Sequence, residues 1–189
     1  MWDKNARDFQ RTAAGIAKVT AGVSAAVTVG FSAMVKSSID TADQMSKSSA
    51  IVGVQIEKLS GLRHATDLSG VSFTQLEGGL NKFNKQVADA AEGVGAGAER
   101  FDQLGISLKN TDGSLKDNYT LIEEVADALS RMEDGANKSA IAQDLFGKSG
   151  AKLIPLLNGG KNGLREFSEE ARRLELIISE QTGKNAELF

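Results

Sequence analysis

The chain lacks the residues on which many enzyme sites depend. Its 189 residues include no cysteine, one proline and one histidine. Without cysteine there is neither a disulfide nor a thiolate ligand. The lone His64 cannot form a usual zinc site. No Ser-His-Asp set is obvious either, although residue counting leaves a serine–lysine mechanism open. So few prolines allow long, uninterrupted helices.

Positive charge is also scarce. The net charge is −3, with 25% charged and 41% apolar residues. A specific nucleic-acid partner is therefore not expected, because binding to a phosphate backbone needs clustered Lys and Arg. The composition is that of a folded globular protein. Charges of both signs are mixed at the start of the chain, which argues against a signal peptide.

Residues 1–50 are predicted to form a long helical arm. Within it, the run Val19–Val35 carries no charge and is rich in small residues. It is slightly shorter than the about 20 apolar residues that span a membrane. Gly22, Ala26 and Gly30 are four apart and share one helix stripe, which permits close helix approach and marks a candidate self-association surface. Burial against other copies is preferred, with a membrane span and a partly disordered arm as alternatives.

After the arm, apolar residues recur at helical spacing between glycine stops. Gly53-Val54 and Gly70-Val71 echo one another, each a turn that leads into a helix. Ser72 and Gln75 have capping-box spacing. The expected helical stripes are Ile56, Leu59, Leu62, Ala65 and Leu68; Phe73, Leu76, Leu80, Phe83, Val87 and Ala90; Tyr119, Ile122, Val125, Ala126, Leu129 and Met132; and Leu164, Phe167, Ala171, Leu174 and Ile178. Shorter helices are expected at 98–104 and 137–146.

The predicted fold class is all-α. The helical arm, residues 1–50, precedes a compact multi-helix domain, residues 51–189, with at most one very short hairpin, near the turn at 110–113. The shared helical spacing predicts a core. Its members are expected to include Leu59, Leu76, Phe83, Leu129, Phe146 and Leu157.

Apparent chemical motifs fail on inspection. Gly147-Lys148-Ser149 resembles the end of a P-loop, but Ala142 occupies the required glycine position. A calcium loop ending its turn at Gly113 lacks carboxylates at its first and last positions. His64 is expected on the surface, and the adjacent Glu123 and Glu124 are expected on a solvated helix face. No catalytic, cofactor-binding or metal residue is predicted, and the chain is not expected to be an enzyme.

An ordered set of segments resembles the core region of phage tail tape measure proteins. It comprises Leu129–Gly135, Lys138–Ala142, Leu145–Gly150 and Ile154–Leu157, with Phe101–Ile106 and Asp112–Leu115 upstream. Within it, Leu145, Phe146, Gly147, Ser149 and Gly150 are the suspected signature, with a structural role. The chain departs from the family at Glu175, where a glycine commonly follows the residue equivalent to Leu174.

The resemblance implies a structural protein that scaffolds assembly of the tail tube and sets tail length. It would lie in the tail lumen of the virion, be present in the host cytoplasm during assembly, and leave at DNA ejection. The implied partners are other copies of itself, three preferred over six, together with tail tube and tail-tip proteins and tail assembly chaperones. Contact with the host membrane on ejection is also implied. No cofactor is expected.

Two further expectations follow. A helix of 189 residues would measure about 280 Å, which is short for a tail ruler, so the chain is interpreted as an N-terminal piece of a longer protein or a truncated form. The alternative function is a membrane-active helical protein, such as a pore-forming or effector protein, and depends on Val19–Val35.

Overall fold

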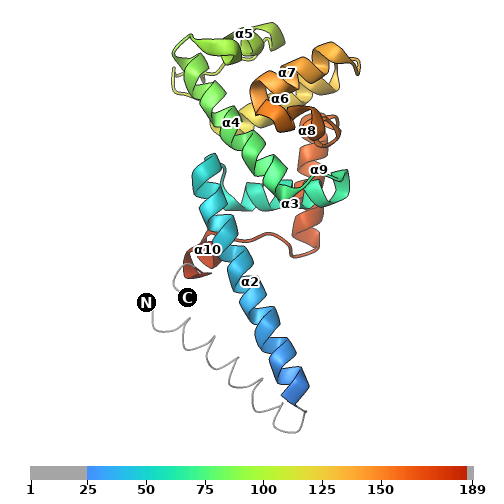
Figure 1. Ribbon diagram of the computed structural model, residues 1–189. Helices are drawn as coiled ribbons and strands as arrows, with labels where there is room; N and C mark the ends of the chain where they lie inside the picture. The colour runs from blue at the N-terminus through green and yellow to red at the C-terminus, as the bar shows by residue number, and fades with distance from the viewer. Residues whose placement is uncertain (1–24, 187–189) are drawn as a thin grey trace. The chain divides into compact units, whose positions relative to one another are not determined.

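The computed structural model describes the backbone of residues 25–186 and the side chains from residue 36 onward (Figure 1). The prediction of an all-α fold is confirmed, since no strand occurs in the described range and the expected hairpin is an isolated Lys109–Leu115 bridge. The helices are α2 (Ala25–Val52), α3 (Ile56–Ser69), α4 (Phe73–Ala91), α5 (Gly95–Leu104), α6 (Asn118–Ser130), α7 (Ala136–Phe146), the 3₁₀ helix η2 (Gly147–Ser149), α8 (Gly150–Leu157), α9 (Gly160–Arg173) and α10 (Glu180–Ala186).

Helix α2 contributes to two parts of the chain. The compact unit begins at Ala42, earlier than the expected boundary after residue 50. Met45 and Val52 are fully buried in the core, so the end of the predicted arm packs on its own domain rather than only on other copies. Of the suspected self-association stripe, Gly22 lies outside the described residues. Ala26 and Gly30 lie on the α2 backbone, and the surroundings of their side chains are outside the described part.

Within the compact unit, α4 packs against α3, α5, α7 and α8, while α9 packs against α3 and α6 (Figure 1). The capping box predicted at the start of α4 is present, with Ser72 and Gln75 each accepting the other's backbone N–H. The core prediction is confirmed, because each of its six members is at most 2% exposed: Leu59, Leu76, Phe83, Leu129, Phe146 and Leu157.

Several helices end in the same way. A residue just past the helix has a positive φ, and the next N–H donates to the carbonyl five positions earlier. The residues with positive φ are Gly53, Gly70, Gly93, Gly105 and Glu175, and the donors are the apolar residues that follow each, Val54, Val71, Val94, Ile106 and Leu176. Glu175 is the only non-glycine residue of the described range with a positive φ, at 57°.

Two predicted stripes extend too far. Leu68 is 55% exposed because it lies in the last turn of α3, beyond the residues that face the core. Leu174 is also 55% exposed, since α9 ends at Arg173 rather than near residue 178. In contrast, α5 begins earlier than expected, at Gly95. These differences fall at helix ends. There, the direction in which the chain turns decides which side chains are buried, and the spacing of apolar residues does not.

Replacing Glu175 with glycine is expected to stabilise the protein. The left-handed conformation costs a residue with a Cβ about 1–2 kcal/mol, and glycine adopts it freely at some cost in chain entropy. Glu175→Gly should therefore raise the free energy of unfolding by about 0.5–1 kcal/mol in urea titrations. The matched variant Glu175→Ala removes the same charge but keeps the Cβ and should bring no gain. Equal stability of the two variants would contradict the interpretation.

Candidate functional site

The segment that carries the suspected family signature forms one sharp turn. Helix α7 ends with Leu145 and Phe146, which are 0% and 1% exposed. Gly147 then has a φ of 70°, and η2 leads directly into α8 at Gly150. Ser149, the last residue of η2, is half-buried. The Gly147-Lys148-Ser149 sequence thus follows a helix rather than a strand, as expected for a motif that is not a P-loop.

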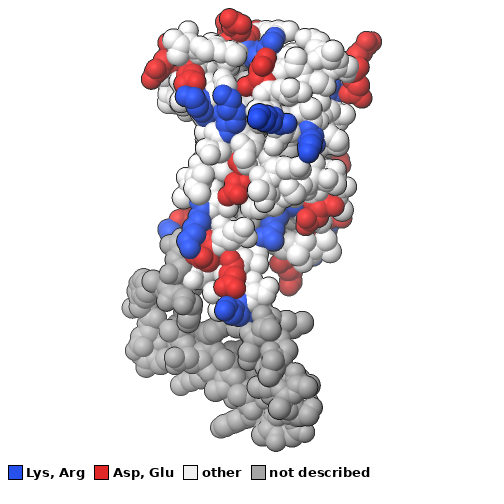
Figure 2. All heavy atoms as spheres, in the orientation of Figure 1, with Lys and Arg blue, Asp and Glu red and all other residues white. Residues whose placement is uncertain are grey.

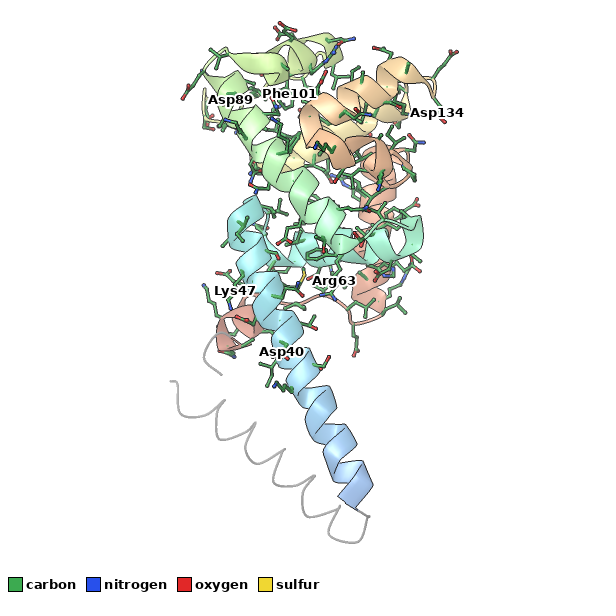
Figure 3. All side chains as sticks on the ribbon, viewed as in Figure 1. Asp40, Lys47, Arg63, Asp89, Phe101 and Asp134 are labelled. Carbon is green, nitrogen blue, oxygen red and sulfur yellow. The ribbon has the colours of Figure 1, made fainter. Side chains whose placement is uncertain are left out.

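Three phenylalanines hold this turn against the rest of the unit. The rings of Phe146 on α7 and Phe83 on α4 stack with centroids 4.9 Å apart and planes 9° apart. Phe101, on α5 next to α4 in Figure 3, meets Phe83 edge-on with centroids 5.9 Å apart. Such pairs contribute about 0.5–1.5 kcal/mol each beyond the burial of their area. The aromatic cluster therefore ties α4, α5 and α7 together, and it includes Phe146 and Phe83 of the predicted core.

Two glycines make the close packing around the cluster feasible. A Cβ placed on Gly150 would lie 1.9 Å from the carbonyl oxygen of Ala142, a backbone atom that cannot move aside. A Cβ on Gly79 would lie 2.7 Å from Cδ1 of Leu153. Gly150 therefore lets α8 start against α7, and Gly79 lets α4 approach α8.

A second group of residues forms a polar seam between α6 and α9. Glu123 was expected on a solvated face but is only 6% exposed. Its Oε1 accepts the Nε–H of Arg165 at 3.2 Å, and its Oε2 lies 3.3 Å from Nζ of Lys161. The N–H of Lys161 donates to Oδ1 of Asp127 at 2.7 Å, at the start of α9. The signal in the sequence was the position of Glu123, four residues after the buried Tyr119 and so on the same face of the helix.

The seam continues along α3. His64, expected on the surface, is only 9% exposed, and its Nε2 lies 3.5 Å from Oε2 of Glu170. The correction follows from the packing of α9 over α3, which apolar spacing within α3 does not report. Burial raises the pKa of the Tyr119 phenol, whose ring lies 4.9 Å from Nζ of Lys58. A Cβ on Gly61 would lie 2.5 Å from Oγ of Ser168, so the two helices are in close contact.

The contacts at the turn and along the seam pack and orient the helices. Among the described residues, no group of three or more His, Asp or Glu side chains could hold a metal ion. Within that same part of the chain, no helix combines the length and apolar character needed to cross a membrane. Comparisons of the chain with protein-family models, with curated proteins and with solved structures give no match. The candidate site is therefore the α7–η2–α8 turn with its aromatic cluster.

Truncating Phe146 should destabilise the protein strongly. The ring is fully buried and stacked, so Phe146→Ala should lower the free energy of unfolding by about 3–5 kcal/mol in thermal or urea melts. The control Leu174→Ala removes a half-exposed side chain and should change stability by less than about 0.5 kcal/mol. Similar melts for the two variants would mean that the cluster does not hold the turn.

Adding a methyl group at Gly150 should also be costly. Gly150→Ala forces α8 away from α7, and overpacking of this kind typically costs about 1–3 kcal/mol. Gly163 in α9 offers a matched control, because a Cβ there meets nothing within 4 Å. Gly163→Ala should be neutral or stabilising, since alanine favours helices. The measurement is the urea midpoint of each variant, and equal midpoints would contradict the steric argument.

Proposed function

We propose that this chain is a phage tail tape measure protein or a fragment of one, which scaffolds assembly of the tail tube and sets tail length. The observation that carries the proposal is the ordered residue set from Leu129 to Leu157. Its signature residues, Leu145 to Gly150, occupy a turn whose packing tolerates few alternatives, as the contacts of Phe146 and Gly150 illustrate. A purely structural signature suits a protein that assembles rather than catalyses.

The position at which the chain departs from the family also supports the proposal. Glu175 stands where a glycine is common, and it has a φ of 57°. That conformation is the one glycine favours. The chain therefore departs from the family in the residue type at this position, but its backbone has the conformation that a glycine would take here.

The proposed partners follow from the same role. Copies of the chain would associate through the stripe of Gly22, Ala26 and Gly30. They would form a closed ring, because contacts around an axial lumen must close, with three copies preferred and six possible. Tail tube proteins, tail-tip proteins and tail assembly chaperones would complete the assembly. The proposed location is the tail lumen of the virion, after a stage in the host cytoplasm.

The proposal predicts that chain length controls tail length. Inserting about 28 helix-forming residues ahead of Ala42 leaves the compact unit intact and adds about 42 Å of helix. Virions assembled with the longer protein should have tails longer by about that amount in electron micrographs. The matched control substitutes the same number of residues with helix formers in the same stretch and should leave tail length unchanged. Unchanged tails in the insertion variant would overturn the proposal.

A further inference from the structure

Four lysines gather on one face of the compact unit. A Cβ built on Gly147 would lie 3.2 Å from Cγ of Lys82, so Lys82 of α4 adjoins the start of η2, where Lys148 follows. Lys85 lies about one turn after Lys82 on α4, and Lys152 lies about one turn after Lys148. Figure 2 shows a row of Lys and Arg side chains across the region where Figure 1 places α4 and α8. We call Lys82, Lys85, Lys148 and Lys152 the lysine strip.

The charges of the lysine strip are largely unneutralised. Over the described residues, Lys82, Lys148 and Lys152 take part in no ion pair, and Lys85 has only Asp89 at 3.6 Å. Exposed pairs of this kind are nearly neutral in energy. Some cations elsewhere are closely paired, as Arg100 is with Asp144 at 2.8 Å. The strip is thus a local positive field on a chain whose net charge is −3.

The strip stands on backbone that is anchored by buried side chains. Lys82 precedes Phe83, the ring at the centre of the aromatic cluster. Lys148 lies in the turn anchored by Phe146, and Lys152 precedes Leu153, which is 1% exposed. The backbones that carry the lysines are therefore fixed before any partner arrives, which lowers the entropy lost on binding.

An exposed glycine adjoins the lysines. Gly78 lies inside α4, and a Cβ at this position would meet nothing within 4 Å. It shares a face of α4 with Lys82 and Lys85, at spacings of four and seven residues. A glycine in a helix interior costs about 1 kcal/mol relative to alanine, and no contact within the described part of the chain explains it. Its effect is to leave bare backbone at which another chain can approach closely.

We propose that the lysine strip and Gly78 form a docking surface for an acidic helical segment of a partner protein. Its carboxylates would face the lysines, and its backbone would lie close to Gly78. The strip contains no arginine, the residue best suited to phosphate, and no aromatic side chain on which bases could stack. Four cations are also few for a nucleic-acid duplex, which binds through many phosphate contacts. This inference is independent of the proposed phage function.

The test uses the full chain and a labelled helical peptide of about 20 residues, with glutamates along one face and alanines elsewhere. Fluorescence anisotropy should show binding that weakens as salt rises from about 50 to about 300 mM. The matched peptide with glutamine in place of glutamate should not bind. Lys148→Glu should weaken binding about fivefold or more, whereas Lys109→Glu, the same charge change on the hairpin outside the strip, should have an effect of less than about twofold.

A second pair of variants tests shape rather than charge. Gly78→Leu blocks close approach while favouring the helix, so it should weaken peptide binding and leave thermal stability intact. Gly163→Leu, also at an open helical glycine, should not affect binding. Equal effects of Lys148→Glu and Lys109→Glu, or no loss on Gly78→Leu, would overturn the proposal. Tighter binding of a DNA duplex of about 20 base pairs than of the acidic peptide, with loss on Lys148→Glu, would overturn it in favour of a nucleic-acid surface.

Discussion

The compact unit depends on ending its helices sharply. Most linkers between its helices contain few residues, so most helices have to stop and redirect the chain almost at once. A residue with positive φ does this, and the apolar residue that follows donates to the last turn. Val54 and Val71 are buried in this role, so these two stops also anchor the next segment to the core, whereas Val94 and Leu176 are about half exposed.

The position of α4 follows from these stops. Because Gly70 stops α3 and Gly147 stops α7, the helices on either side of α4 can approach it closely. Gly79 and Phe83 then set the spacing, since the glycine admits Leu153 of α8 and the phenylalanine stacks on Phe146 of α7. Shape at these few contacts determines the arrangement, because interiors packed at crystal density tolerate little change of volume.

Apolar spacing and glycine stops are local properties, so the sequence alone could predict most of the helices, the capping box at Ser72 and the core residues from Leu59 to Leu157, but not α8 or α10. It could not predict which polar residues become buried. His64 and Glu123 are covered by α9, a helix far along the chain. Local spacing places Glu123 on the same helix face as Tyr119, but it does not show which distant helix covers that face. The lysine strip was missed for the same reason, since Lys82 and Lys148 become neighbours only in the folded chain.

The helices around α4 and the helix α9 are therefore held in place by different kinds of contact. Around α4, volume and shape dominate. Along α9, the fully buried apolar residues are few, notably Leu164 and Ala171, so direction has to come from polar contacts such as those of Glu123. A buried carboxylate adds little net stability once its desolvation is counted, but its paired cations fix how α9 lies. A surface that has to present charges at fixed spacing is better supported by close packing of side chains, as around α4. The lysine strip lies in that region, next to the aromatic cluster, whose rings cannot repack without opening the core.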